Sequence, residues 1–240
     1  MIYAIIGPTC VGKTKLSIEL AKKINGEIIN CDSMQIYREL NIGVAKITEK
    51  EKENIPHHLF DIVSIKDDFS VYEYQKLARE KIIEILNKGK NVIIVGGTGL
   101  YLRAVLYNYD FNGNKTKEKY YDKFQIIGLT KDRKKLYEDI NKRVEIMLEN
   151  GLEEEAKSLY DKKIFTRAVK TAIGYKELYE YFSRAVSRKE AIEKIKLNSR
   201  RYAKRQYTFF NNQFDEINWY DVEELTIEEI VSDIEKKNNL

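Results

Sequence analysis

Hydrophobic residues between Met1 and Leu129 form short runs that alternate with longer amphipathic segments. The short runs are rich in isoleucine and valine and are bounded by glycine or polar residues, as buried parallel strands are. They occupy Ile2–Ile6, Glu27–Asn30, Val92–Val95 and Phe124–Leu129. Because helical segments separate these runs, the pattern predicts an α/β fold. We expect a parallel sheet flanked by helices that binds ligands at the carboxyl ends of its strands.

Two segments between these strands have the pattern of amphipathic helices. Lys13–Ile24 follows the first strand and a glycine-containing loop. Ser70–Lys88 begins with Ser70 and Glu73 at the spacing of a capping box, and Gly89 is a typical stop signal after it. Its apolar stripe recurs at the helical period and consists of Tyr74, Leu77, Ala78, Ile82, Ile85 and Leu86.

A third helix is expected after the fourth strand, capped by Thr130 and ended by Gly151. Its apolar face contains Leu136, Ile140, Val144, Met147 and Leu148. The rest of the C-terminal part is predicted to be mostly helical, and the polar residues 112–119 are predicted to form an exposed loop. With only two prolines and no repeats, no linker is evident, so residues 1–240 are predicted to form a single domain.

Composition narrows the class of protein. The 240 residues are 43% hydrophobic, enough for one core and at most a small appendage. The net charge of +4 is too small to indicate a nucleic-acid partner by itself. No apolar run approaches the roughly 20 residues of a membrane span, and no leader pattern precedes the first strand, so we expect a cytoplasmic, monomeric protein without a membrane partner. Cys10 and Cys31 lack metal-ligand or disulfide spacing and are expected to be small buried fillers.

The strongest chemical signal is the loop Gly7–Thr14, which matches the phosphate-binding pattern Gly-x-x-x-x-Gly-Lys-Ser/Thr. Between a strand and a helix, such a loop directs backbone N–H groups and the positive helix end at an anion. Lys13 would neutralise phosphate oxygens, and the Thr14 hydroxyl would bind Mg²⁺. The loop predicts a P-loop NTPase-like sheet and phosphate binding, but not ATP hydrolysis. Its candidate phosphate-binding residues are Gly7, Pro8, Thr9, Cys10, Val11, Gly12, Lys13 and Thr14.

Two other strand ends carry candidate chemistry. Asp32 follows the second predicted strand, beside the phosphate loop, where a carboxylate can accept a proton or hold an amine. The alternative is that Asp32 or Ser33 caps a turn. After the third strand, Gly96–Tyr101 has no carboxylate where an ATPase would organise Mg²⁺. Its glycines either admit a substrate close to the backbone, with the Thr98 hydroxyl beside it, or serve a tight turn. The missing acid argues against a motor or switch NTPase.

Residues 198–210 form a strip of cations and aromatic side chains. On a helix, Arg200 and Lys204 share one face, and Arg201 and Arg205 share the next. Such a strip can hold phosphates and stack on bases, whereas a strip without a partner would be a solvated cationic face. The phosphate loop in the same domain favours the first interpretation.

These motifs, taken together, resemble the tRNA dimethylallyltransferase family, also called tRNA isopentenyl transferases. No single segment is diagnostic, but their order and completeness are. The resemblance implies transfer of a dimethylallyl group from dimethylallyl diphosphate to the exocyclic amine of the adenosine 3′-adjacent to the anticodon, with diphosphate released. The matching segments are Gly7–Thr14, Asp32–Tyr37, Gly43–Lys46, Pro56–Ile62, Gly96–Tyr101, Ala172–Glu177 and Arg200–Gln206.

The resemblance also implies roles for single residues. Asp32 would take the proton of the amine, and Lys13 with Mg²⁺ on Thr14 would stabilise the leaving diphosphate. Thr98 is a further catalytic candidate, and Arg205 is expected to add to the diphosphate clamp. The candidate contacts with the tRNA anticodon arm are Asp32, Ser33, Met34, Gln35, Thr98, Arg200 and Lys204. The two family-motif histidines, His57 and His58, have no evident mechanism and are expected to belong to a packed loop.

The chain departs from the family pattern in one large respect. Family members usually carry a helical insertion that grips the anticodon arm, and here only residues 112–123 occupy its place. Prenyl chemistry should survive this loss, but we expect weaker tRNA affinity and a shallower salt dependence than in longer relatives. Two alternatives remain: an adenylate isopentenyltransferase that accepts a free nucleotide, and a small-molecule kinase. A purely RNA-binding role would leave the phosphate loop without a purpose.

Overall fold

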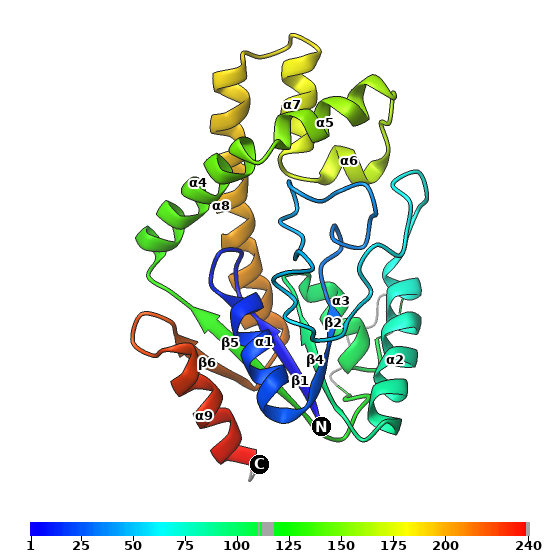
Figure 1. Cartoon of the computed structure of the whole chain (residues 1–240), viewed down its shortest axis with the longest axis vertical. Helices are drawn as coiled ribbons and strands as arrows, with labels where there is room; N and C mark the ends of the chain where they lie inside the picture. Colours follow the sequence, from blue (N-terminus) through cyan, green and yellow to red (C-terminus); the bar gives the residue numbers. More distant parts are fainter. Residues whose placement is uncertain (110, 112–117, 239–240) are drawn as a thin grey trace.

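A six-stranded parallel sheet in the order β3–β2–β4–β1–β5–β6 forms the centre of this computed structural model (Figure 1). The structure describes residues 1–109, 111 and 118–238, so residues 112–117 of the expected loop and of the 112–123 segment lie outside it. The strands are β1 (Ile2–Ile6), β2 (Gly26–Asn30), β3 (His57–His58), β4 (Asn91–Val95), β5 (Phe124–Thr130) and β6 (Ile217–Asp221). The helices are α1 (Lys13–Ile24), α2 (Val71–Asn87), α3 (Gly99–Leu106), α4 (Arg133–Glu149), α5 (Leu152–Asp161), α6 (Arg167–Thr171), α7 (Tyr175–Phe182), α8 (Arg188–Gln213) and α9 (Ile227–Asn238).

Strand β1 separates two cores because successive residues of a strand point to opposite faces of the sheet. Ile2, Ala4 and Ile6 pack in one core with residues of α2 and α3. Tyr3 and Ile5 pack in the other with residues of α1, α4 and α9. All residues of β1 and β2 are buried. The predicted parallel sheet with helices on both faces is therefore confirmed.

Beyond the carboxyl ends of the strands, α5, α6 and α7 form a helical lobe with a third core (Figure 1). Helix α8 connects this lobe to the sheet and packs on α7, α4 and α3. Its 26 residues span about 39 Å at 1.5 Å per residue. The lobe and the sheet together surround the strand ends at which the sequence predicts ligand binding.

Several element boundaries differ from the expectation. Thr130 does not cap a helix: it is the last residue of β5 and pairs with Asp221 of β6. Asp132 caps α4 instead, accepting two N–H groups of its first turn. Gly151, at φ 97°, lies between α4 and a separate helix, α5. The edge strands β3 and β6 were not expected, because their sequences contain no apolar run and they form by pairing with a neighbouring strand.

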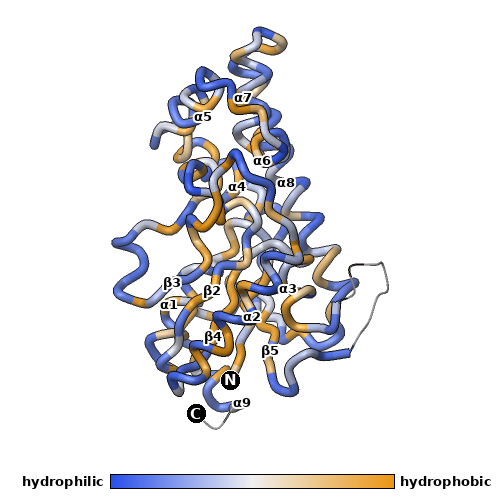
Figure 2. The backbone as a smooth tube through the Cα atoms, turned by 90° about the vertical axis from the view of Figure 1, so that its right-hand side faces the viewer, coloured by the Kyte–Doolittle hydropathy of each residue, from blue (hydrophilic) through white to orange (hydrophobic). Residues whose placement is uncertain are grey.

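Hydropathy follows this layering, with apolar residues along the sheet and hydrophilic residues on the outer loops (Figure 2). In α2 the predicted capping box of Ser70 and Glu73 is present, but Leu77 is 36% exposed. Met147 and Leu148 of α4 are only partly buried. None of the helices in the described ranges has both the length and the apolar character that crossing a bilayer requires.

Candidate active site

The phosphate loop connects β1 to α1, as the sequence predicts. Gly7 has a φ of 143°, and a Cβ on it would lie 2.7 Å from the carbonyl oxygen of Leu129. Gly12 has a φ of 101° and is the N-cap of α1, so both positions depend on the conformational freedom of glycine. Residues Thr9–Thr14 line a cavity at the start of α1, and the helix end makes that cavity favourable for an anion.

Two cations lie beside the loop. Lys13 Nζ donates to the carbonyl oxygens of Gly7 at 3.0 Å and Pro8 at 2.7 Å, and Arg143 of α4 donates to Thr9 Oγ1 at 3.4 Å. Burial lowers the pKa of Lys13 to about 8, and the Arg143 guanidinium acts in the same direction. Among the described residues no carboxylate forms an ion pair with Arg143. An anion held by the loop would compensate both cations.

Asp32 lies directly beyond β2. Its Oδ1 accepts the N–H of Met34 at 2.9 Å, so the turn-capping alternative is correct as far as it goes. The same side chain also lines the phosphate-loop cavity. Burial raises the pKa of Asp32, although the Met34 N–H and the charge of Lys13 oppose that rise. This carboxyl group therefore takes up a proton more readily than an exposed aspartate does.

The Gly-Gly-Thr-Gly turn after β4 packs against the Asp32 turn. A Cβ on Gly96 would lie 2.1 Å from the carbonyl oxygen of Cys31, so a magnesium-organising acid cannot occupy this position. Thr98 Oγ1 accepts the N–H of Ser33 at 3.0 Å and donates to Ser33 Oγ at 3.2 Å. Thr98 is not among the residues that line the neighbouring cavities. Its hydroxyl holds the turn that carries Asp32.

Two adjoining cavities open at this edge of the sheet. The smaller, of about 240 Å³, contains the phosphate loop. The larger, of about 340 Å³, lies against α4, α8 and the start of α7 and has a largely apolar lining. Among the described residues, Asp32 is the only carboxylate in either lining. The residues common to both linings are Thr9, Cys10, Asp32, Val44, Ala45, Arg143 and Tyr202.

The other residues predicted after β2 divide between the two cavities. Ser33 and Met34 line the larger one, and Gln35 lines the smaller one. Gln35 Nε2 donates to the carbonyl oxygens of Val44 at 2.9 Å and Ala45 at 3.3 Å. Gln35 therefore holds a second loop, whose residues form part of both cavity walls.

Helix α8 reaches the site through the inner face of the basic strip. Gln206 is 4% exposed; its Oε1 accepts the N–H of Thr9 at 2.9 Å, and its Nε2 donates to the carbonyl oxygen of Gly97 at 3.1 Å. Tyr202 lines both cavities, and burial together with the Asp32 carboxylate raises its pKa. Neither role was predicted from the sequence, in which the strip was interpreted only as a possible exposed surface.

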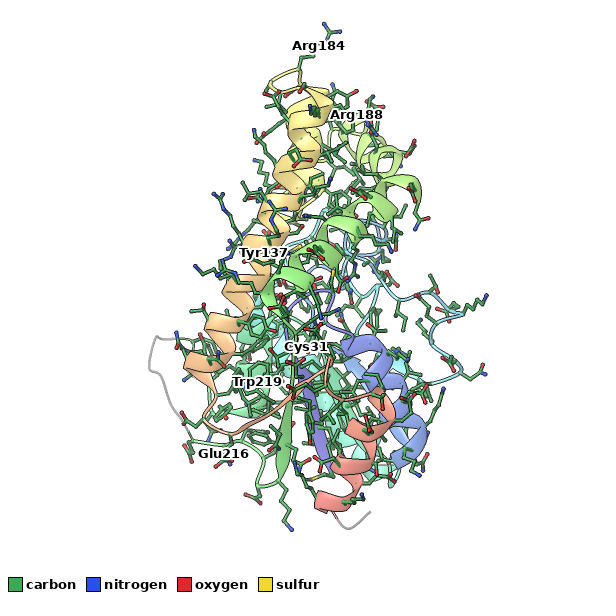
Figure 3. The ribbon with its side chains drawn as sticks, turned by 90° about the vertical axis from the view of Figure 1, so that its left-hand side faces the viewer. Cys31, Tyr137, Arg184, Arg188, Glu216 and Trp219 are labelled. Atoms are coloured by element: carbon green, nitrogen blue, oxygen red, sulfur yellow. The ribbon has the colours of Figure 1, made fainter. Side chains whose placement is uncertain are left out.

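The cations of the strip occupy three environments. Arg201 and Lys204 are exposed and line a groove on the outside of α8. Arg205 lines this groove and also the larger cavity. Arg200 is half-buried and donates to Asn141 of α4. Helix α4 lies beside α8 on the face shown in Figure 3. Of the two predicted RNA-binding cations, Lys204 is therefore accessible, and Arg200 joins two helices. Arg205, which was expected to add to the diphosphate clamp, does not line the phosphate-loop cavity.

Arg143 is a charged residue of both cavity linings that was not predicted from the sequence. It lies 134 positions from Thr9 along the chain, so no local motif connects them. The available signal was its place on α4, directly before Val144 and three residues after Ile140, at the margin of the predicted apolar face. A cationic side chain at the margin of this apolar face points toward the interior rather than into solvent.

The two histidines do not belong to a packed loop. They form the edge strand β3, which pairs with β2. His58 Nε2 lies 2.7 Å from Glu27 Oε2, a buried carboxylate that also binds Lys90. His57 Nδ1 lies 2.7 Å from the carbonyl oxygen of Ile55, and its ring lines the phosphate-loop cavity. Burial lowers the pKa of His57.

The two cysteines differ from one another. Cys31 is buried, as expected, and burial raises its pKa to about 12. Cys10 is not a buried filler: it adopts a φ of 66° in the phosphate loop and lines both cavities. The turn of the phosphate loop at Cys10 places its side chain in the lining of both cavities.

Comparison with known proteins identifies the family. The IPP transferase family model matches residues 35–121 and 111–213, which together cover more than half of the chain. The chain belongs to the IPP transferase family. Among curated relatives, the tRNA dimethylallyltransferase of Anoxybacillus flavithermus is 42% identical, with 94% of this chain and 92% of the relative aligned. That of Bacillus subtilis is 41% identical, with 92% and 90% aligned.

Solved structures of IPP transferases have the same fold. The tRNA isopentenylpyrophosphate transferase of Bacillus halodurans superposes with a TM-score of 0.92 at 37% identity, covering 99% of this chain and 95% of the other. The Staphylococcus epidermidis structure gives a TM-score of 0.91 at 36% identity, covering 99% of this chain and 98% of the other.

The alignment with the Anoxybacillus relative extends over 286 positions. Because this chain has 240 residues, the relative contains positions that have no counterpart here.

Proposed function

We propose that this protein is a tRNA dimethylallyltransferase. It transfers the dimethylallyl group of dimethylallyl diphosphate to N6 of the adenosine 3′-adjacent to the anticodon and releases diphosphate. Membership of the IPP transferase family supports the reaction class, since the similar curated proteins carry this name. The observation that carries the mechanism is the position of Asp32, the only carboxylate in the lining shared by two adjoining cavities among the described residues.

The smaller cavity is assigned to the diphosphate. Negative charge accumulates on the leaving group as the allylic C–O bond breaks, and cations placed at that position lower the barrier. Lys13 and Arg143 lie there, beside the phosphate loop. Thr14 also lines this cavity, and its hydroxyl with the diphosphate oxygens would suit Mg²⁺, which prefers oxygen ligands and is commonly bound through substrate phosphates. When bound, Mg²⁺ would supply further charge stabilisation to the departing diphosphate.

The larger cavity is assigned to the adenine. The bond from N6 to C1 of the dimethylallyl group forms while the C1–O bond breaks, and N6 loses one proton. Asp32 accepts that proton, and a raised pKa suits a carboxylate to this role. Ser33, Met34 and Tyr202 line the same cavity and would hold the base beside Asp32.

RNA binding is assigned to the strand-end residues and to the outer face of α8. Lys204 and Arg205 lie along an exposed groove, where they would neutralise phosphates of the anticodon arm. Arg200 would act indirectly by holding α8 to α4. We further propose that the family's helical insertion is missing between α3 and β5. The two family-model matches meet at residues 111–121, and this location supports the assignment.

The test incubates the protein with Mg²⁺ and labelled dimethylallyl diphosphate, with an unmodified anticodon stem-loop and free adenosine nucleotides in parallel. Label should appear on the RNA, and Asp32→Asn should slow its transfer by at least about 100-fold. Label on the nucleotides alone would replace the proposal with a free-nucleotide transferase. ATP turnover in the absence of any dimethylallyl transfer would replace it with a kinase.

A further inference from the structure

A loop without helix or strand, Asn41–Lys46, forms part of the wall common to the two cavities. Val44 and Ala45 line both cavities, whereas Gly43 lines only the larger one. The loop is closed by its own hydrogen bonds, from the N–H of Ala45 to the carbonyl oxygen of Ile42 and from the N–H of Lys46 to that of Asn41, each at 3.0 Å. The shape of both cavities therefore depends on what fixes this loop in place.

One carboxylate holds the first half of the loop. Glu155 of α5 accepts the backbone N–H groups of Asn41 at 3.2 Å, Ile42 at 3.0 Å and Gly43 at 3.3 Å. It also accepts the Tyr175 hydroxyl. Among the described residues Glu155 forms no ion pair with lysine or arginine. These four donors are therefore what compensates its charge, and charge-assisted bonds of this kind are stronger than neutral ones.

Packing makes the attachment specific. A Cβ on Gly43 would lie 2.5 Å from the Tyr175 ring and 2.8 Å from Leu152, so the loop touches α5 and α7 of the lobe. Burial and the neighbouring Glu155 raise the pKa of Tyr175, which keeps its hydroxyl protonated and donating. The second half of the loop is held separately, by Gln35 from the Asp32 side.

We propose that Glu155 is a positioning residue for the RNA acceptor, acting through Asn41–Gly43. The inference rests on the proposed function, which places the adenine in the larger cavity and the diphosphate in the smaller one. Of the three residues that Glu155 holds, Gly43 lines a cavity, and that cavity is the larger one. Gln35 fixes the part that both cavities share. Loss of Glu155 therefore weakens use of the RNA more than use of dimethylallyl diphosphate.

Steady-state kinetics of Glu155→Gln, with each substrate varied in turn, test this. The amide keeps the size of the side chain but directs an NH₂ group at N–H donors. The KM for an anticodon stem-loop should rise roughly tenfold, the change that about 1.4 kcal/mol produces, while the KM for dimethylallyl diphosphate changes by less than about twofold. Glu154→Gln, an exposed neighbour on the same helix, is the matched control and should leave both values unchanged.

Tyr175→Phe removes one of the four donors and should raise the KM for RNA by a smaller factor with the same selectivity. It also serves as the test if Glu155→Gln does not fold, as judged by circular dichroism. Equal rises in both KM values, or kinetics indistinguishable from those of Glu154→Gln, would overturn the positioning role while the proposed function stands. Absence of transfer by the unmodified protein would overturn the proposed function, and the inference with it.

Discussion

Replacing Gln206 by methionine should destabilise the folded protein by about 3 kcal/mol. Methionine has nearly the same length and volume, but it can neither accept the N–H of Thr9 nor donate to the carbonyl oxygen of Gly97. A buried donor or acceptor left unpaired costs roughly 1–3 kcal/mol. Two such groups lose their partner here, at a side chain that is 4% exposed, and little water can replace it.

Urea unfolding followed by circular dichroism measures the effect. With an m-value of about 3 kcal/mol per molar urea, the midpoint should fall by roughly 1 M. Lys204→Met is the matched control: it lies two residues away on the same helix, is exposed, and should change stability by less than about 0.5 kcal/mol. Because Thr9 belongs to the phosphate loop, Gln206→Met should also raise the KM for dimethylallyl diphosphate.

A midpoint for Gln206→Met equal to that of Lys204→Met would refute the reasoning. It would mean that the two backbone groups find other partners at no net cost. A loss of stability without any rise in the KM for dimethylallyl diphosphate would show that the hydrogen bonds of Gln206 stabilise the fold but do not set the geometry of the phosphate loop.

Asp32→Asn should slow transfer by at least about 10²-fold in single-turnover assays. The wild-type rate should rise with pH through the pKa of Asp32, which burial raises. A flat pH profile would contradict the assignment of Asp32 as the base. The same raised pKa means that the ionised carboxylate destabilises the fold above both pKa values, so Asp32→Asn should be more stable at neutral pH and lose this advantage below about pH 4. Gly99→Ala would place a Cβ 2.2 Å from the Phe209 ring, and the overpacking should cost about 1–3 kcal/mol; an unchanged melting temperature would show that α3 and α8 adjust freely. A plot of the logarithm of RNA affinity against the logarithm of salt concentration should have a shallower slope than for the Bacillus subtilis relative. Each lost phosphate contact should reduce the slope by about 0.7. Equal slopes would show that the shorter chain makes as many contacts.

Local sequence determined the elements that were predicted correctly. The predicted helix Lys13–Ile24 has the same bounds as α1, because glycine at its start and Asn25 in the left-handed region at its end define it locally. The phosphate loop is likewise specified by its own residues. Thr130 was assigned wrongly because a strand pairing with β6, more than eighty positions later in the chain, extends β5 through it. A cap and a strand end can look alike until the partner strand is known.

The site residues also divide into those that local sequence determines and those that depend on distant parts of the chain. Asp32 was predicted from its place after a strand, which depends on nearby residues alone. Gln206 was placed only within an exposed cationic strip, although it binds Thr9 from 197 positions away. Arg143 belongs to a helix whose apolar face was predicted correctly, but the direction of its side chain depends on how α4 packs against the loop. Tertiary packing, which the sequence pattern does not encode locally, decided these two positions.

The C-terminal elements β6 and α9 have a consequence for how members of this family are recognised. Both lie beyond residue 213, where the family match ends, yet Tyr220 and Ile230 share a core with Leu16 and Leu20 of α1. A truncated gene product that ended after α8 would retain every recognisable motif and still leave part of the apolar side of α1 uncovered, because α1 packs on α9 as well as on the sheet. Genome surveys based on motifs alone would count such fragments as enzymes, although the unit that folds is longer than the unit that is recognised.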